Sequence, residues 1–410
     1  MIEISRAKLG FNIDSPSSQR ITSQPPLSLY IHLPWCIKKC PYCDFNSHEM
    51  RSVVAQSNDL DAALQARYLS ALEADLQSSL PLIWGRVVHS IFIGGGTPSL
   101  FTAQAIDQLL TSVRTHVRLS ADAEITMEAN PGSFEQARFE GFSKAGVNRL
   151  SIGVQSFNDA KLKALGRVHD AAQAFKAIAV AQRYYKTFNI DLMYGLPSQT
   201  MGQLRADLEQ ALACKPPHLS YYQLTMEPNT LFAAKPPPLP PEDDLADMQA
   251  LIEAQTSAAG FGHYEISAYA QPNQQARHNL NYWQFGDYLG IGAGAHGKLT
   301  FHDGIRRYAR YKHPAAYMNE AIKGNACETE TLLDPKDLPF EFMLNVLRLS
   351  DGVPTTHFVE RTGLPLAAVN RAMQKACAKG LLDPNPAVIK ATPLGLTFLN
   401  DLQEIFLPEA

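Results

Sequence analysis

The chain has 410 residues, 45% of them apolar, so it can form two or three packed units and is neither a disordered tail nor a small disulfide-stabilised domain. Its 36 Lys and Arg residues and 40 Asp and Glu residues give a net charge of −4, which excludes broad electrostatic binding to nucleic acid or membrane surfaces. The sequence has no run of roughly 18 apolar residues that would span a membrane, and its start lacks an apolar secretion signal. We therefore expect a cytoplasmic protein without a transmembrane segment.

The predicted elements begin after a polar, Ser-rich segment, residues 1–24, which has no hydrophobic periodicity and is predicted to be a loose arm. Beyond it, short β-branched or aromatic runs alternate with amphipathic stretches. The predicted strands cover residues 27–33, 87–93, 124–128, 149–154, 188–193 and 219–224. Between the first two strands, Leu64, Tyr68, Leu72 and Leu76 recur every four residues and predict a helix with one buried face.

The alternation of strands and helices predicts a parallel α/β sheet with right-handed connections, because each crossover is long enough to hold a helix. One helix is predicted to begin at an S-x-x-Q capping box formed by Ser133 and Gln136. Both a barrel and a doubly wound sheet fit this alternation, and in both folds reactive side chains gather at the carboxyl ends of the strands. Here Glu128 closes the third strand, Gln155 follows the fourth and Asp191 lies in the fifth, which predicts one shared site.

The sequence changes character after the sixth strand. Residues 235–244, KPPPLPPEDD, form a stiff, proline-rich connection that is not expected to be helical. A helix pattern, a strand at 263–266 and the segment ARHNLNYWQFGDYLGIGAGAHG follow. Three further helix patterns, a hairpin within 379–390 and a last helix at 392–406 predict a small helical unit of winged-helix type. We therefore expect four parts, namely an arm at 1–24, a core at 25–230, an extension at 231–333 and a C-terminal domain at 334–410.

Cys36, Cys40 and Cys43, with the spacing C-x3-C-x2-C, are the most informative residues in the chain. In a reducing compartment such a group marks a metal or redox site and not a disulfide. Three thiolates on one loop can hold three corners of a cubane iron–sulfur cluster and leave the fourth iron open to a reacting ligand. A zinc ion is the alternative, although zinc sites usually join two separated ligand pairs. Its missing ligand would be His32, Asp44 or His48.

Several motifs resemble those of a known family. C-x3-C-x-Y-C after the first strand and Gly94-Gly95-Gly96-Thr97-Pro98 after the second resemble the radical S-adenosylmethionine (SAM) superfamily. YIHLPWC, FIGGGTPS, EANPGS, SIGVQSFN, LGRVHD, NIDLMYGLP and HNLNYW are together similar to the oxygen-independent coproporphyrinogen III oxidase family, and within it to its heme-chaperone branch. The resemblance implies a [4Fe-4S] cluster on the three cysteines, with SAM chelating its open iron. It also implies an incomplete parallel (β/α)6 barrel of radical SAM type, followed by the C-terminal domain.

The resemblance further implies which residues surround SAM. Tyr42 would lie against its adenine ring, and glycines would let the backbone approach the ligand closely. The residues implied to hold the nucleoside and methionine groups are Tyr30, Gly94, Gly95, Gly96, Thr97, Glu128, Gln155, Arg167 and Asp191. A carboxylate suits ribose hydroxyls, and an arginine suits a carboxylate. Taken singly, Gln155, Arg167 and Asp191 are better explained as hydrogen-bond partners of strand ends.

Two features favour the heme-chaperone branch over the oxidases. The oxidases carry a further cysteine two residues after the third one, where this chain has Phe45. The motif HNLNYW at residues 278–283 is linked to heme binding in the chaperone branch, so His278 is implied to ligate or contact heme. Judged from the residues alone, the same histidine and its aromatic neighbours would pack the edge of the barrel.

The resemblance thus implies a heme chaperone and not an enzyme. It would pass heme to acceptors such as respiratory hemoproteins or an iron-storage protein, and it would form a homodimer. The alternative is radical decarboxylation of coproporphyrinogen III.

Two other interpretations carry less weight. The G-x-G-x-x-G match at residues 292–297 has no clear strand before it, so we expect a tight loop at the cofactor pocket and not a dinucleotide site. Arg371, Lys375 and Lys379 share one helix face and would suit contact with DNA, but they suit a solvated helix equally well. We expect no binding of nucleic acid.

Overall fold

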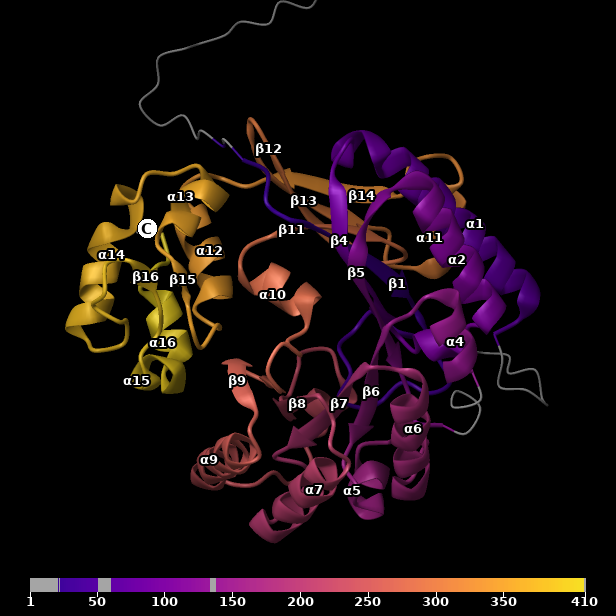
Figure 1. Ribbon diagram of the computed structural model, residues 1–410, viewed down its shortest axis with the longest axis horizontal. Coiled ribbons are helices and arrows are strands. Elements are labelled where there is room, and N and C mark those ends of the chain that lie inside the picture. The colour runs from indigo at the N-terminus through magenta and orange to yellow at the C-terminus, as the bar shows by residue number, and fades with distance from the viewer. Residues whose placement is uncertain (1–20, 22, 51–59, 133–137, 409–410) are drawn as a thin grey trace, which may run out of the picture.

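The computed structural model describes residues 21, 23–50, 60–132 and 138–408. Nearly all of the predicted arm lies outside these residues, and so does the predicted helix start at Ser133. Within the described residues, an α/β core is followed by a small, mainly helical C-terminal domain (Figure 1). No helix in the described ranges is long and apolar enough to cross a membrane.

Parallel strands form the centre of the sheet. In chain order they are β1 (Leu27–Leu33), β4 (Val87–Gly95), β5 (Arg118–Ala129), β6 (Arg149–Gln155), β7 (Thr187–Tyr194) and β8 (His218–Gln223). Each of them overlaps a strand that the sequence predicts, and strands that follow one another in the chain are neighbours in the sheet. This order is typical of βα repeats whose crossovers share one hand. The predicted parallel α/β sheet is therefore confirmed.

Helices connect these strands and cover the outer face of the sheet (Figure 1). They are α1 (Ala62–Ser79), α2 (Ala103–His116), α4 (Phe139–Ala145), α5 (Asp159–Ala164), α6 (Ala171–Tyr184) and α7 (Met201–Ala213). Helix α1 begins where the Asp61 side chain accepts the backbone N–H of Leu64 at 2.9 Å. Its predicted apolar face is buried at Tyr68, Leu72 and Leu76, and partly buried at Leu64.

Along the strands, residues alternate between an apolar outer face and a polar inner face. On β6, Ile152 is buried in the core under the helices, whereas Ser151 lines an interior cavity. The register places Glu128 of β5 beside Ser151, Ser151 beside Asn189 of β7, and Asn189 beside His218 of β8. Strands β4 to β8 all contribute side chains to this cavity, so the sheet curves around it as in an incomplete barrel.

The segment 231–333 lengthens the sheet at both edges. Helices α8 (Leu231–Ala234) and α9 (Glu242–Ala258) lead to β9 (Gly262–Glu265) and β10 (Ala268–Ala270), which continue the sheet beyond β8. Strands β11 (Asp287–Ile291), β12 (His296–Phe301), β13 (Gly304–Arg310) and β14 (Cys327–Leu332) continue it beyond β1, with α11 (Pro314–Ala321) between the last two. Helix α10 (Arg277–Trp283), from the same segment, packs on the inner side of the sheet, where His278 lies against Phe92.

The G-x-G-x-x-G match differs from its prediction. Strand β11 directly precedes Gly292, so the expectation that no strand comes before the motif is wrong. A strand, β12, and not a helix follows it, so the motif offers no helix N-terminus to a pyrophosphate. The described residues that line the cavity do not include 292–297. Gly294 packs on Asn46 instead, whose Nδ2 would lie 2.3 Å from an added Cβ atom.

The C-terminal domain has its own apolar core, which includes Phe342 and Phe358. Its helices are α12 (Leu338–Val346), α13 (Thr356–Thr362), α14 (Ala367–Ala378), α15 (Pro393–Thr397) and α16 (Leu399–Glu404). The hairpin predicted within 379–390 is present as a short antiparallel pairing, in which the Asp383 N–H donates to the Lys390 carbonyl oxygen at 2.9 Å and Leu382 forms a bridge with Ala391. Strand β16 (Val388–Ile389) also pairs with the earlier strand β15 (Val353–Pro354). The predicted last helix is broken at Phe398, whose φ of −109° and ψ of 48° leave the helical region.

Candidate functional site

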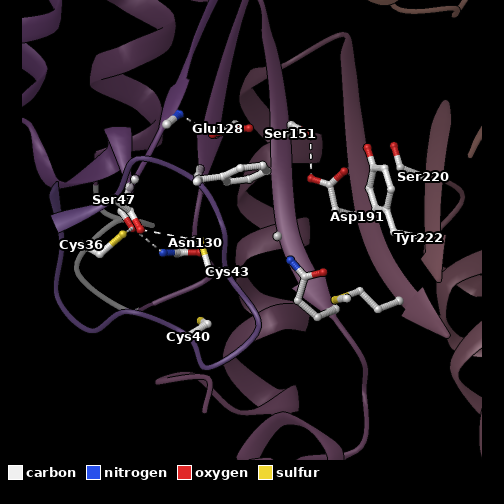
Figure 2. Close-up of a pocket in the computed structure, with 18 of the residues that line it drawn as sticks. Cys36, Cys40, Cys43, Ser47, Glu128, Asn130, Ser151, Asp191, Ser220 and Tyr222 are labelled. Atoms are coloured by element: carbon white, nitrogen blue, oxygen red, sulfur yellow. Dashed lines mark hydrogen bonds between the residues drawn. The ribbon is translucent and has the colours of Figure 1, made fainter. Parts of the chain in front are cut away.

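A cavity of about 450 Å³ lies on the inner side of the sheet (Figure 2). Its volume is typical of pockets that bind small molecules. The predicted site residues that line it are Cys36, Cys40, Tyr42, Cys43, Gly95, Gly96, Thr97, Glu128, Gln155, Arg167, Asp191 and His278. Gly94 and Tyr30 do not line it. The Tyr30 hydroxyl lies 2.8 Å from Nδ1 of His32 instead.

The cysteine loop, residues 34–50, follows β1 and includes two short paired strands, β2 (Trp35–Cys36) and β3 (His48–Glu49). Cys36, Cys40 and Cys43 are free thiols that lie around one side of the cavity (Figure 2). Burial raises the pKa of Cys36 to about 11, and it also raises the pKa of Cys43. Thiols in such surroundings stay protonated unless a metal ion stabilises the thiolate.

Each of the three sulfurs has a side-chain hydrogen-bond partner. The pairs are Thr97 Oγ1 and Cys36 Sγ at 3.5 Å, Arg167 Nη1 and Cys40 Sγ at 3.7 Å, and Ser47 Oγ and Cys43 Sγ at 3.6 Å. Hydrogen bonds to sulfur tune the potential of an iron–sulfur cluster. These residues therefore fit a cluster held by three thiolates. In the part of the chain that the structure describes, no group of three or more His, Cys, Asp or Glu side chains is placed to hold a single metal ion.

The fourth ligands considered for a zinc ion differ in their surroundings. Both ring nitrogens of His32 are engaged, Nδ1 with the Tyr30 hydroxyl at 2.8 Å and Nε2 with the Asn46 carbonyl oxygen at 2.9 Å. His48 Nε2 lies 3.3 Å from Oδ1 of Asn46. Asp44 is the candidate among the three that lines the cavity.

The glycine run at the end of β4 packs the sheet against the cysteine loop. The backbone N–H groups of Gly96 and Thr97 donate to the carbonyl oxygens of Leu33 and Trp35 at 2.8 and 2.7 Å. A Cβ atom on Gly96 would lie 2.5 Å from the Trp35 oxygen. Glycine, expected here from the close approach of a ligand, is thus also required by close packing of the protein on itself.

Glu128 and Asp191 place two half-buried carboxyl groups on the cavity wall (Figure 2). The Gly95 N–H donates to Oε2 of Glu128 at 3.0 Å. Ser151 Oγ and Asn189 Nδ2 donate to Asp191 at 2.7 and 2.6 Å. Burial, together with the charge of Asp191, raises the pKa of Glu128 to about 8, and burial raises the pKa of Asp191 as well. A cationic ligand would relieve this cost, because it stabilises the ionised carboxylates.

Arg167 connects three parts of the cavity wall. Its Nη2 donates to Oδ1 of Asn130 at 2.6 Å and to the Gly153 carbonyl oxygen at 2.8 Å. Asn130 in turn donates to Oγ1 of Thr97 at 3.0 Å. Nearby, Gln155 ends β6 with a φ of 68°, a left-handed conformation that is uncommon outside glycine and often marks functional sites.

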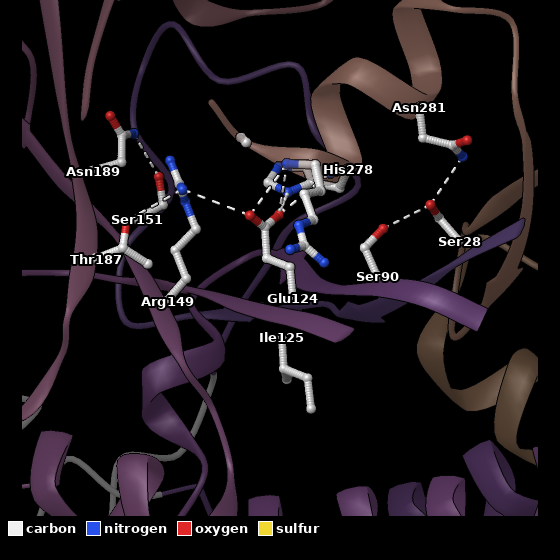
Figure 3. Close-up of polar contacts among 12 residues, drawn as sticks. Ser28, Ser90, Glu124, Ile125, Arg149, Ser151, Thr187, Asn189, His278 and Asn281 are labelled. Atoms are coloured by element: carbon white, nitrogen blue, oxygen red, sulfur yellow. Dashed lines mark hydrogen bonds and ion pairs between the residues drawn. The ribbon is translucent and has the colours of Figure 1, made fainter. Parts of the chain in front are cut away.

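His278, on helix α10, lines the cavity. Its side chain lies next to those of Glu124 on β5 and Arg149 on β6 (Figure 3). Its Nδ1 lies 2.8 Å from Oε1 of Glu124, and its ring packs on Phe92 with a centroid distance of 4.3 Å. Arg149 Nη1 lies 3.6 Å from Oε2 of Glu124. Burial opposes ionisation of Glu124, but His278 and Arg149 outweigh it and lower its pKa to about 2. The carboxylate is therefore charged at neutral pH.

Much of the cavity wall was not predicted from the sequence. The missed residues that line it include Thr126, Asn130, Arg149, Ser151, Asn189, His218, Ser220 and Tyr222. Most of them occupy alternate positions of β5 to β8, and the intervening residues are apolar and buried. The alternation in EITME and RLSIG was the available signal, because it predicts a strand with one polar face.

Comparison with known proteins identifies the family. Residues 30–211 match the family model of the radical SAM superfamily, and residues 333–398 match that of the HemN C-terminal domain. The chain is 48% identical over 387 residues to the heme chaperone HemW of Escherichia coli (strain K12), which covers 94% of this chain and 99% of the relative. The chain belongs to the HemW family.

Other relatives agree with a HemW-family chain. The mitochondrial radical S-adenosyl methionine domain-containing protein 1 of Bos taurus is 35% identical over 402 residues, covering 95% of this chain and 87% of the relative. The structure of coproporphyrinogen III oxidase (HemN) from Escherichia coli, a radical SAM enzyme, is similar with a TM-score of 0.77 and 25% identity, over 93% of this chain and 90% of that one. The family resemblance and the predicted radical SAM fold with its C-terminal helical domain are confirmed.

Proposed function

We propose that this HemW-family protein is a heme chaperone, which binds heme in the cavity and passes it to acceptor hemoproteins. The observation that carries the proposal is that His278, in the HNLNYW helix, faces the same cavity as the three cysteines. Relatives that are 48% identical over nearly the whole chain are named heme chaperones. Respiratory hemoproteins and an iron-storage protein in the cytoplasm are the acceptors we propose, with a homodimer as the transferring form.

In this proposal Cys36, Cys40 and Cys43 hold a [4Fe-4S] cluster. When bound, the cluster supplies an iron with a free coordination position, at which SAM binds through its methionine end. Thr97, Arg167 and Ser47 supply the hydrogen bonds to the three thiolates.

The rest of the cavity wall suits SAM. Glu128 and Asp191 supply negative charge near its sulfonium and hydrogen-bond acceptors for its hydroxyl groups. Arg167 is suited to bind its carboxylate. Tyr42, Gln155, Gly95, Gly96 and Thr97 line the same space. Gly94 and Tyr30 do not contact SAM directly in this proposal. They support the cavity wall, because both pack on residues that line the cavity or lie behind its lining.

Heme is the cargo in this proposal. His278 offers Nε2 as an axial ligand for the iron, because its Nδ1 is bonded to Glu124. Phe45, in the cysteine loop, lines the cavity and is 60% exposed, so it offers an aromatic face to a porphyrin at the opening. It stands where the related oxidases would carry a further cysteine, which favours transport of heme over decarboxylation of a porphyrinogen.

The test compares both activities in one sample. The full chain is purified without oxygen, its cluster is reconstituted, and hemin is titrated by absorbance while coproporphyrinogen III decarboxylation is assayed in parallel. We expect hemin to bind tightly to the wild type, binding to weaken in His278→Ala, and no decarboxylation to occur. Robust decarboxylation without hemin affinity would overturn the proposal, as would unchanged hemin affinity in His278→Ala with an intact cluster.

A further inference from the structure

Glu124 of β5 bonds to the amino end of helix α10, which lies far from β5 in the sequence (Figure 3). Its two carboxylate oxygens accept the backbone N–H of Arg277 at 3.0 and 3.1 Å, and Oε1 also accepts the N–H of His278 at 3.3 Å. The residue at the N-cap position, Ala276, makes no side-chain capping bond. Glu124 therefore supplies, from another element, the acceptor that a helix needs at its first turn.

The same carboxylate fixes the ring of His278. Nδ1 lies 2.8 Å from Oε1, and Phe92 packs against the ring at a centroid distance of 4.3 Å and an interplanar angle of 31°. Carboxylate oxygens accept hydrogen bonds, so Nδ1 donates to Oε1 and Nε2 is the ring nitrogen that is left to bind a metal ion. Arg149, 3.6 Å from Oε2, favours the ionised carboxylate. Among the described residues Nε2 has no hydrogen-bond partner, and the side chain lines the cavity.

We infer that Glu124 is the positioning residue of the heme ligand: its bond to Nδ1 leaves Nε2 of His278 free for the heme iron and makes it a stronger electron donor. The inference rests on the proposed function, because it assumes that His278 ligates heme. Metal-bound histidines commonly donate their second N–H to a carboxylate, which fixes the tautomer and raises the basicity of the ligand. Loss of such a partner typically lowers metal affinity by about 10- to 100-fold.

A purely structural role for Glu124 predicts a different result. If Glu124 only anchored α10, another contact that holds this helix would matter in the same way. Asp122 provides that comparison, because its Oδ2 accepts from Nη1 of Arg277 at 2.9 Å. Glu124→Gln keeps an oxygen acceptor for the helix N–H groups but removes the charge at Nδ1 of His278. Asp122→Asn changes an anchor of the helix and leaves the bond between Glu124 and His278 in place.

The experiment is a hemin titration of the anaerobically purified full chain, followed by redox titration of the bound heme. In Glu124→Gln we expect the hemin dissociation constant to rise about 10- to 100-fold. The midpoint potential should become more positive, because a weaker donor stabilises ferric iron less. Asp122→Asn should keep the wild-type values of both. Unchanged affinity and unchanged potential in Glu124→Gln would overturn the inference, and so would equal shifts in the two variants.

His278→Ala, measured in parallel, separates this inference from the proposed function. If His278→Ala binds hemin like the wild type, the assigned ligand is wrong and the inference falls with it. If His278→Ala loses hemin while Glu124→Gln does not, only the inference falls.

A measurement on the wild type covers the case in which Glu124→Gln does not fold. A carboxylate bonded to Nδ1 raises the frequency of the iron–Nε2 stretch in the resonance Raman spectrum of the ferrous heme complex. We expect a frequency above that of an imidazole with a neutral partner. A frequency in the neutral range overturns the inference.

Discussion

The guanidinium of Arg167 donates from Nη1 to the sulfur of Cys40 across 3.7 Å. Cys40 belongs to the loop after β1, whereas Arg167 lies between α5 and α6, in the connection after β6. The same guanidinium also bonds to Asn130, which follows β5. One side chain therefore joins loops from three strand ends into a single wall around the cavity.

Arg167→Lys tests this connection. A lysine ammonium lacks the planar fork and is not expected to bond to Cys40, Asn130 and the Gly153 carbonyl at once. We expect the free energy of unfolding to fall by about 1.5–3 kcal/mol, the usual range for a hydrogen bond to a charged group. Chemical denaturation without oxygen measures it. The control is Arg183→Lys, which changes an exposed arginine on α6 and should stay within about 0.5 kcal/mol of the wild type. Equal effects of the two variants would contradict the proposed connection.

Glu128→Gln tests whether folding raises the pKa of the Glu128 carboxyl group in the cavity wall. Folding raises the pKa of Glu128 from 4.5 to about 8. Between these values the unfolded chain has lost a proton that the folded protein keeps, so this group lowers the free energy of unfolding as the pH rises, and its effect is constant above about 8. Glutamine removes this dependence and keeps an acceptor for the Gly95 N–H. In ligand-free protein, the stability of the variant relative to the wild type should therefore increase across this pH window.

Chemical denaturation at several pH values gives that difference directly. The control is Glu209→Gln, which changes an exposed residue of α7 and should differ from the wild type by a constant amount. A difference between Glu128→Gln and the wild type that does not change with pH would show that Glu128 ionises normally in the folded protein.

Gly96→Ala tests the packing of the cysteine loop on β4. The new Cβ atom would lie 2.5 Å from the Trp35 carbonyl oxygen, a backbone atom that moves only with the loop. We expect a loss of about 1–3 kcal/mol in the free energy of unfolding, as for other overpacked sites. Gly202→Ala is the matched control, because its Cβ atom would lie 3.9 Å from its nearest neighbour within a helix. It should leave stability unchanged or raise it by up to about 1 kcal/mol. The packing argument fails if both alanines are tolerated equally.

The sequence predicted the parallel strands and the cysteine loop well because both depend on local patterns. A run such as LSLYIHL is buried on both faces and has strong β propensity, so its limits as β1 could be read directly. The strand β11 was missed because Asp287, Gly290 and the flanking glycines interrupt its apolar run. Its pairing with β1 depends on tertiary contacts with a strand far away in the sequence.

The polar inner wall was predicted only at the strand ends. Glu124 and His278 are 154 residues apart, and no local pattern links them. Their contact follows from the path of α10 across the inner side of the sheet, whereas the residues of this helix, judged alone, predict packing at the edge of the barrel. Ser151, Asn189 and His218 were missed for a different reason, since their alternation with apolar residues was visible but was interpreted as strand formation alone.

Iron and acid-labile sulfide content of the anaerobically purified chain, measured together with zinc, tests the central claim most directly. We predict about four irons and four sulfides per chain in the wild type. Cys36→Ser, Cys40→Ser and Cys43→Ser should lose both elements, whereas Cys377→Ser, outside the cavity, should retain them. One zinc ion per chain without sulfide, or full iron and sulfide in the three cysteine-loop variants, would contradict the account.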